Sequence, residues 1–290
     1  MKIIKFIRYL IETLIILIFF SIFRIVGIKI STFISGKIFT LIGPLFRSKN
    51  IISKNLKKAF PNISDNEIKN HIHLMWNYYG KIFAEYPFLK NFRNSSLANN
   101  IEIDGKEYLK EIQNENVIFI SGHFDNFELM AMSLEKEGIN LAAVYRPLNN
   151  YFLNKIMEYL RKKYICKNQI QKGIKGVKDS IKYIDSGHSI ALMIDQRVSE
   201  GIKIKFFKDE ALTTTLPAQL ALKYNLKIVP IFIERKNINN FRMKVFNPID
   251  ISSFNSKLEI TKKLNQVLEE MIAENPNQWI WTGITDSKRS

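Results

Sequence analysis

The stretch that decides the fold runs from Val117 to Met130 and reads Val-Ile-Phe-Ile-Ser-Gly-His-Phe-Asp-Asn-Phe-Glu-Leu-Met. Its first four residues are apolar and mostly β-branched or aromatic, which is typical of a short buried strand. From Phe127 onward the apolar residues have the spacing of a helix. His123 is therefore expected in the turn between a strand and a helix. Such turns commonly hold ligands, because a rigid framework presents their side chains to solvent.

An acidic partner for the histidine lies nearby in the sequence. Glu128 follows His123 by five residues, a spacing that resembles a His-x4-acid acyltransferase motif. In such a site the neutral imidazole takes a proton from an attacking hydroxyl while the carboxylate fixes the tautomer, so no covalent intermediate is required. The alternative interpretation is a capping box, in which Asp125 caps the helix, Glu128 completes the box and His123 is an ordinary loop residue.

Composition limits the class of protein. A chain of 290 residues with 46% hydrophobic content suits one globular domain with an appendage. The net charge of +16 favours anionic partners such as nucleic acid, phosphorylated lipid, an anionic membrane or an acidic carrier protein. An A/T-rich coding bias toward lysine is an alternative source of part of this excess. The single cysteine, Cys166, excludes an internal disulfide and fits a reducing compartment.

The amino-terminal segment is membrane-like. The run from Thr13 to Phe23 is free of charged residues and is preceded by basic residues. Counted from Tyr9, with Glu12 and Arg24 snorkelling, it reaches the length of about 20 residues that a membrane span needs. No small-x-small cleavage site follows it, so we expect a retained anchor rather than a signal peptide.

The next segment is also apolar but carries lysines. Residues 25–46 have the composition of an interfacial or re-entrant helix. The predicted organisation is therefore a membrane anchor with an interfacial helix over residues 1–46 and an α/β domain over residues 47–290. The basic residues at the start of the chain predict a cytoplasmic amino terminus.

The remainder of the chain alternates between two periodicities. Apolar runs predict strands at 101–103, 117–120, 141–145, 190–194, 227–233 and 241–245. Helical spacing predicts helices at 64–86, 105–112, 174–184 and 258–272, and one that begins near 127. This alternation predicts an α/β fold with a mostly parallel mixed sheet flanked by helices.

Two further polar residues follow predicted strands. Arg146 and Asp195 each stand just beyond an apolar strand, as His123 does. Asp195 is thus an alternative to Glu128 as the carboxylate that orients the imidazole. The guanidinium of Arg146 donates in a fixed fork that suits a phosphate, and its alternative role is that of a surface residue in a turn.

Five segments in one order carry a family resemblance. They are Ser121–Glu128, Tyr145–Asn150, Asp195-Gln196 with Phe206-Phe207, Thr213–Leu222 and Asn275–Trp281. Together they resemble the lipid A biosynthesis acyltransferases, the late lauroyl and myristoyl transferases of lipopolysaccharide assembly, over nearly the whole chain. The resemblance implies a glycerolipid-acyltransferase-like fold.

The resemblance also implies an activity. The expected enzyme lies in the cell inner membrane with its catalytic domain on the cytoplasmic face. It moves a fatty acyl group from acyl carrier protein to a hydroxyl of a phosphorylated glycolipid, without a metal or another cofactor. His123 would be the general base, with Glu128 and Asp195 as further catalytic residues and with Arg146 and Gln196 in substrate binding.

Three other interpretations compete with this one. One is an acyltransferase for another membrane glycolipid, such as a phosphatidylinositol mannoside. A nucleic-acid-binding protein would explain the charge, but the chain has no recognisable binding motif and such a protein would not need the apolar amino terminus. A metal hydrolase using His123, Asp125 and Asp195 would lack a second nearby histidine.

Overall fold

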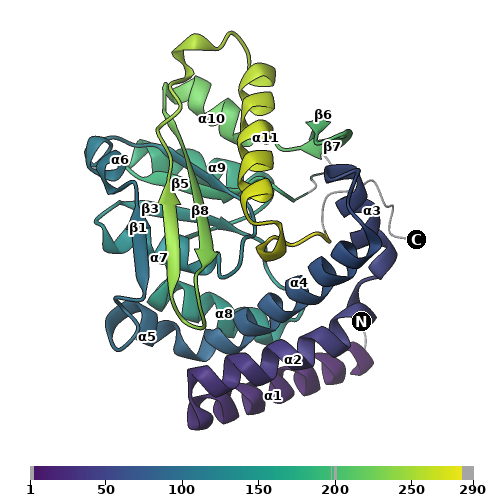
Figure 1. Cartoon of the computed structure of the whole chain (residues 1–290). Helices are drawn as coiled ribbons and strands as arrows, with labels where there is room; N and C mark the ends of the chain where they lie inside the picture. The colour runs from purple at the N-terminus through teal and green to yellow at the C-terminus, as the bar shows by residue number, and fades with distance from the viewer. Residues whose placement is uncertain (1–2, 197, 199–200, 283–290) are drawn as a thin grey trace.

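The computed structural model describes residues 3–196, 198 and 201–282, so residues 283–290 of the predicted α/β domain lie outside the described part (Figure 1). The described residues form a seven-stranded sheet in the order β1-β9-β8-β2-β5-β3-β4 and a two-stranded hairpin of β6 and β7. The strands are β1 (Ile101–Asp104), β2 (Ile118–Ser121), β3 (Leu141–Tyr145), β4 (Asn168–Gln171), β5 (Ser189–Met193), β6 (Ile202–Phe206), β7 (Asp209–Thr213), β8 (Ile228–Arg235) and β9 (Phe241–Val245). Within the large sheet β8 and β9 are antiparallel and the other neighbours are parallel. The predicted mostly parallel mixed sheet is confirmed.

Burial explains which strands the sequence predicted. Every residue of β2 and β8 is buried, as expected of central strands covered on both faces, and both appear in the sequence as apolar runs. The edge strand β4 reads Asn-Gln-Ile-Gln, and only Ile170 is buried. One apolar residue gives no periodic signal, so the sequence analysis missed this strand.

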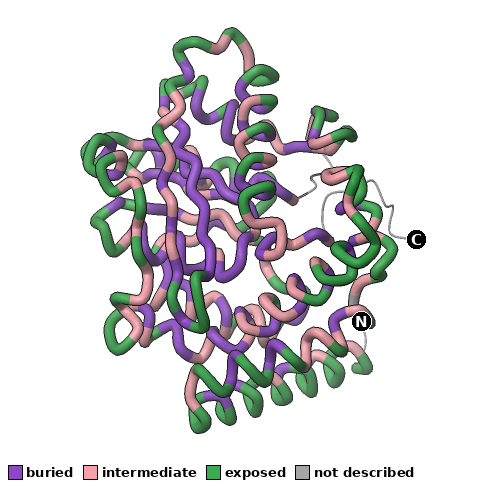
Figure 2. The backbone as a smooth tube through the Cα atoms, viewed as in Figure 1, coloured by how far each residue is buried: buried purple, intermediate pink, exposed green. Residues whose placement is uncertain are grey.

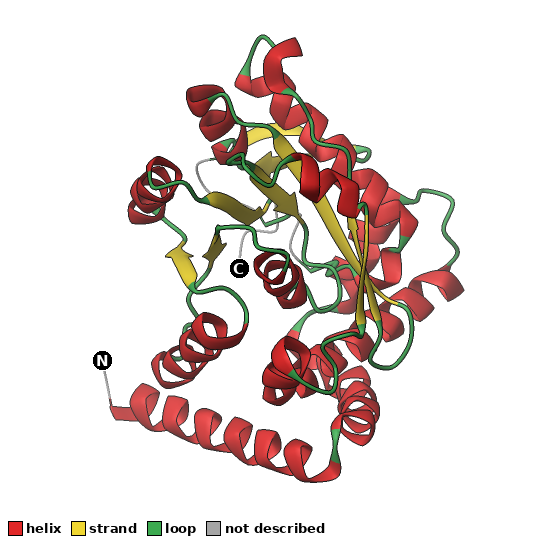
Figure 3. Cartoon of the chain, turned by 90° about the vertical axis from the view of Figure 1, so that its left-hand side faces the viewer, coloured by secondary structure: helices red, strands yellow, loops and turns green. Residues whose placement is uncertain are grey.

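Helices cover both faces of the sheet (Figure 3). They include α7 (Glu128–Lys136), α8 (Tyr151–Tyr164), α9 (Ile174–Asp185), α10 (Leu216–Tyr224) and α11 (Lys257–Glu274). With right-handed crossovers, the connection from β2 through α7 and the connection from β5 through α10 leave on opposite faces. The gap between the carboxyl ends of β2 and β5 is therefore the point of an α/β sheet where a ligand crevice is expected.

The described residues before β2 form six more α-helices. They are α1 (Ile3–Val26), α2 (Ile28–Phe46), α3 (Lys49–Ala59), α4 (Asp65–Glu85), α5 (Leu89–Asn94) and α6 (Lys106–Glu111). The predicted helix after Ser64 is confirmed as α4, and it begins with a capping box in which Ser64 and Glu67 bond each other's backbone N–H. A short 3-10 turn, η1 (Tyr86–Phe88), follows it.

Helices α1 and α2 form a hairpin whose turn is Gly27, with φ of 82°. Both are long and apolar enough to cross a membrane, and their outer faces are exposed (Figure 2). On the inner side, α2 packs closely on α4: the hydroxyl of Ser35 donates to the carbonyl of Gly80 at 2.6 Å. A Cβ atom on Gly43 would lie 2.2 Å from the ring of Trp76, so only glycine permits this approach.

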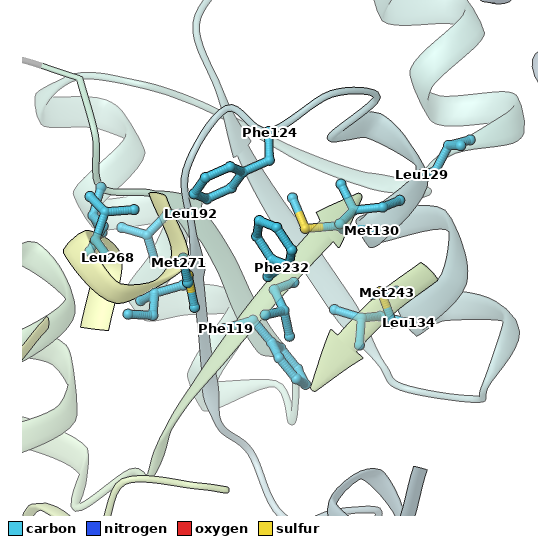
Figure 4. Close-up of a cluster of buried hydrophobic side chains, with 14 of the residues drawn as sticks. Phe119, Phe124, Leu129, Met130, Leu134, Leu192, Phe232, Met243, Leu268 and Met271 are labelled. Atoms are coloured by element: carbon cyan, nitrogen blue, oxygen red, sulfur yellow. The ribbon is translucent and has the colours of Figure 1, made fainter. Parts of the chain in front are cut away.

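The core anchors the turn that carries the histidine. Phe124 is fully buried, and its ring meets that of Phe232 edge-on with 4.7 Å between centroids. Leu268 and Met271 of α11 belong to the same buried cluster (Figure 4). Because Phe124 cannot leave this cluster without opening a large cavity, the neighbouring His123 is held in place.

Candidate active site

The register of two neighbouring strands brings His123 and Asp195 together. Ser121 of β2 is paired with Met193 of β5 in a parallel ladder, and each candidate residue follows two positions later. Nδ1 of His123 lies 2.7 Å from Oδ1 of Asp195. The backbone N–H of His123 also donates to Oδ2 of the same carboxylate at 2.6 Å. Asp195 therefore fixes both the ring and the backbone of the histidine.

The environment of Asp195 keeps its carboxylate charged. Burial acts to raise its pKa, but the charge of the His123 imidazolium and hydrogen bonds from His123 and Trp279 outweigh burial and hold the pKa below its ordinary value. The indole N–H of Trp279 donates to Oδ2 at 2.9 Å. A buried carboxylate with these donors is a suitable charge partner for an imidazolium.

This pairing sets the chemistry of the ring. With Nδ1–H donating to the carboxylate, Nε2 of His123 carries the lone pair and accepts protons. The amide nitrogen of Gln196 lies 3.2 Å from Nε2. The ring of Phe127 meets the imidazole edge-on, with 4.8 Å between centroids. The histidine thus has the geometry of a general base.

A cavity of about 530 Å³, the active-site cavity, opens at these strand ends. This volume lies in the range of about 300–1,000 Å³ that is common for small-molecule sites. All five residues predicted from the sequence line it, namely His123, Glu128, Arg146, Asp195 and Gln196. The structure thus brings them together around one space.

The inner wall of this cavity is apolar. We call it the apolar floor, and it comprises Phe119, Ile120, Met130, Ala131, Ala143, Val144, Ile165, Ala191 and Leu192. Phe119, Ala191 and Ala143 are register partners across β2, β5 and β3. Two alanines in one row leave space that larger side chains would fill.

Two of the cations that line the cavity, Arg146 and Lys172, directly follow β3 and β4, and we call them the cationic rim. The backbone of Lys172 is fixed by a hydrogen bond from its N–H to the carbonyl of Tyr145, 2.8 Å long. Desolvation and the neighbouring Arg146 guanidinium lower the pKa of Lys172. Two like charges that line one cavity attract an anion.

Glu128 bonds to residues other than His123. Its Oε1 atom accepts from Nε and Nη2 of Arg161 at 2.8 and 2.5 Å and from the hydroxyl of Tyr86 at 2.8 Å. Burial acts to lower the pKa of Arg161, but the charge of Glu128 outweighs it and the net shift is upward. Burial and the same carboxylate raise the pKa of Tyr86. Of the two carboxylates considered from the sequence, Asp195 contacts the imidazole and Glu128 holds Arg161 in the cavity wall.

The capping-box interpretation of Asp125 is wrong. The cap of α7 is Phe127, without a side-chain hydrogen bond, and Glu128 is the first helical residue. Asp125 has a left-handed backbone, with φ of 31°, and its carboxylate accepts from Nε and Nη2 of Arg235 at 3.0 and 2.6 Å. Arg235 is also paired with the fully buried Glu85. Asp125 is therefore part of a buried ion cluster and does not line the active-site cavity with His123 and Asp195.

The carboxyl-terminal motif, Asn275–Trp281, packs against β8 and against the turn that carries His123. The side chain of Gln278 accepts from the backbone N–H of Arg235 at 2.6 Å and donates to its carbonyl at 3.0 Å. The backbone N–H of Asp125 donates to the carbonyl of Gln278 at 2.7 Å. The next residue, Trp279, forms an isolated β-bridge with Phe124. This segment ties β8, the histidine turn and Asp195 into one unit.

Sequence reasoning missed polar residues of the site, among them Arg161 and Lys172. Lysines and arginines number 43, so neither basic residue stood out. A signal was present for Arg161, since it and Met157 are the buried residues of α8 and lie four positions apart on one face. The weak strand β4 concealed Lys172, which directly follows it.

Comparisons with known proteins identify the family of this chain. The family model described as bacterial lipid A biosynthesis acyltransferase matches residues 2–283. A lipid A biosynthesis acyltransferase of Haemophilus influenzae is 23% identical over 81% of this chain and 76% of its own length. The lipid A biosynthesis myristoyltransferase of Escherichia coli is 22% identical over 85% of this chain and 76% of its own length. A solved 1-acyl-sn-glycerophosphate acyltransferase from Thermotoga maritima is similar with a TM-score of 0.43 and 17% identity, covering 85% of this chain and 98% of that one. This chain is an acyltransferase and belongs to the bacterial lipid A biosynthesis acyltransferase family.

Proposed function

We propose that this protein transfers a fatty acyl chain from acyl carrier protein to a hydroxyl of a phosphorylated lipid A precursor. The observation that carries the proposal is the bonded pair of His123 and Asp195, which faces a cavity with an apolar floor and a cationic rim. Family membership supports acyl transfer in lipid A biosynthesis. The donor, the base and the acceptor hydroxyl are our assignments.

His123 acts as general base in the proposed reaction. Its Nε2 atom takes the proton of the acceptor hydroxyl, whose oxygen attacks the carbonyl carbon of the thioester. Backbone amides or the guanidinium of Arg146 stabilise the resulting oxyanion. The tetrahedral intermediate collapses with cleavage of the C–S bond, and the imidazolium returns its proton to the thiolate. Asp195 stabilises the imidazolium throughout, and no acyl-enzyme forms.

The walls of the active-site cavity match both substrates. The apolar floor suits the hydrocarbon chain of the donor, because burying each methylene contributes about 0.8 kcal/mol. The cationic rim suits the phosphate of the acceptor, and the net charge of +16 favours an acidic carrier protein. Gln196 would bind the hydroxyl near Nε2 of His123. Glu128 would act as a positioning residue by holding Arg161 in the wall.

The amino-terminal hairpin would place this chemistry at a membrane. We assign residues 1–46 to membrane anchoring and residues 47–290 to the catalytic domain. The exposed apolar faces of α1 and α2 support the assignment, since apolar patches of this extent are rare on soluble proteins. Location in the inner membrane, with the site on the cytoplasmic side, follows from the proposed carrier-protein donor.

The test is acyl transfer by the full-length protein in detergent. Acyl carrier protein with a labelled acyl group and a phosphorylated lipid A precursor should yield labelled lipid. The His123→Ala variant should lose transfer, and His73→Ala should keep it, because His73 lies on the exposed face of α4. Full turnover by His123→Ala would refute the mechanism. Transfer to a phosphatidylinositol mannoside in place of the lipid A precursor would refute the acceptor assignment.

A further inference from the structure

A second cavity, of about 490 Å³, lies between α2, α4 and the segment that follows Trp279. Its lining comprises Phe39, Ile42, Arg47, Met75, Trp76, Tyr79, Ile280 and Thr282. Tyr79, Ile280 and Thr282 also line the active-site cavity. The two cavities therefore share a wall. A molecule bound in the active-site cavity near His123 has the second cavity directly beside it.

The second cavity is lined by four apolar side chains and by four that carry a polar group, namely Arg47, Trp76, Tyr79 and Thr282. Arg47 follows α2, and its Nη2 atom donates to the carbonyl of Thr282 at 3.0 Å, which holds the cation at the cavity. Trp76 is 6% exposed, and its indole N–H has no hydrogen-bond partner among the described residues. A buried donor without a partner costs about 1–3 kcal/mol, and such groups are rare in folded proteins. The lining thus offers an apolar space, one free donor and one positive charge.

The position of this cavity indicates where its ligand comes from. One wall is α2, whose opposite face is apolar and exposed: Leu41 is 78% and Leu45 is 84% exposed. Helix α2 is also one of the two helices long and apolar enough to cross a membrane. A lipid held against this helix in a membrane would lie directly beside the cavity.

We propose that the second cavity binds an acyl chain that the acceptor lipid already carries, while the active-site cavity holds the donor chain. The ester or amide carbonyl of that chain accepts the hydrogen bond of Trp76, and Arg47 lies close to the polar headgroup. The inference rests on the proposed function, because an acylated phosphoglycolipid is its acceptor. Two apolar chains must be buried at once during transfer, and one cavity of about 530 Å³ that also admits the reacting groups leaves the second chain without a site.

Filling the cavity tests this inference by kinetics. In Ile42→Trp, a larger ring occupies the space, and the KM for the acylated acceptor should rise on the order of tenfold, which equals about 1.4 kcal/mol of lost binding. The KM for a deacylated disaccharide phosphate should rise much less, so the ratio of the two values is the readout. Leu41→Trp is the matched control, since the neighbouring side chain points away from the cavity. Equal changes in both KM values would overturn the inference.

A second variant tests the free donor without adding bulk. Trp76→Phe keeps an aromatic ring against Gly43 and removes the N–H, so the KM for the acylated acceptor should rise about threefold to tenfold. No change in that KM would show that the indole N–H does not bind the acceptor. Thermal unfolding of each variant shows whether the fold is retained.

Photolabelling separates this inference from the proposed function. The probe is a phosphorylated glucosamine disaccharide lipid with a diazirine in one acyl chain, irradiated with the full-length protein. Labelling of Phe39, Ile42 or Met75 without any acyl transfer would support the cavity and refute the proposed function. Transfer with labels confined to exposed residues such as Leu41 and Leu45 would refute the cavity and leave the proposed function standing.

Discussion

Trp279 donates its indole N–H to Oδ2 of Asp195 at 2.9 Å, across 84 residues of sequence. Because Oδ2 is engaged by the indole and by the backbone of His123, Oδ1 is left to face the imidazole. A tryptophan outside the catalytic pair thus sets which oxygen meets the ring.

Removing this indole N–H should slow the reaction. In Trp279→Phe the ring is kept and one hydrogen bond to a charged group is lost, which costs about 1.5–3 kcal/mol of stability. We expect kcat to fall about tenfold as the carboxylate loses its fixed orientation. Trp281→Phe is the control, because Trp281 donates to the carbonyl of Pro276 and not to Asp195. An equal loss of kcat in both variants would contradict the relationship.

The charge of Asp195 predicts a pH-dependent effect on stability. Its pKa is lowered in the folded protein from an ordinary value of 3.8. The stabilisation is therefore fully present above that ordinary value and is lost as the pH falls through the folded value. The cost of Asp195→Asn in free energy of unfolding should be largest near neutral pH and should shrink in acid. Urea unfolding in detergent, with the exposed Asp185→Asn as control, measures it.

The same variant should reduce turnover. An amide at position 195 cannot stabilise the imidazolium, so kcat should fall on the order of 10²- to 10⁴-fold, as expected for loss of assisted base catalysis. The rate measured at saturating donor and acceptor gives this ratio. Retention of more than half of kcat would show that His123 does not depend on Asp195.

Breaking the pair of Glu128 and Arg161 should destabilise the fold. Glu128→Gln leaves a buried guanidinium without its counter-charge, which costs about 3–5 kcal/mol. The double variant Glu128→Gln, Arg161→Met should recover much of this loss, and a double-mutant cycle in urea gives the coupling energy. Glu115→Gln, which breaks an exposed pair with Lys227, should change stability little. A coupling energy near zero would show that the two side chains act separately.

The alanines of the apolar floor should set acyl-chain length. Ala191→Leu or Ala143→Leu narrows the cavity, so the preferred donor should be shorter than that of the wild type. Discrimination of about 1–3 kcal/mol for each methylene is typical of apolar pockets. Competition between acyl donors of different length measures it, with the exposed Ala273→Leu as control. An unchanged preference in both floor variants would exclude this wall from contact with the chain.

The sequence predicted residues that belong to the site, but not how they pair, because pairing depends on the order of the strands in the sheet. The motif located His123, and the strand ends located Asp195 and Arg146. The pairing of β2 with β5 decides whether Asp195 or Glu128 contacts the imidazole. Local sequence does not reveal this pairing, because β3 and β4 come between β2 and β5 in the chain but lie beyond β5 in the sheet. Local spacing left both carboxylates open, and the sheet register favours Asp195.

The remaining partners depend on contacts between distant segments. The buried cluster of Arg235, Glu85 and Asp125 joins three elements, and nothing in the periodicity of any one of them requires the other two. The capping-box pattern at Asp125 matched in sequence and failed in structure, because a buried arginine offered the carboxylate a stronger partner than a helix N–H. Composition and periodicity predicted the layers of the fold, and long-range charge pairing determined the details of the site.

The glycine contacts of α2 have a consequence for protein engineering. Gly36, Gly43 and Gly80 let α2 and α4 approach until ring and backbone touch, so α2 is shaped to this one neighbour. A truncated protein that begins at residue 47 would expose the side of Trp76 that α2 covers. A different membrane anchor fused at residue 47 would lack a surface that fits α4. Substitutions in the hairpin of α1 and α2 should therefore be restricted to the side chains on its exposed face.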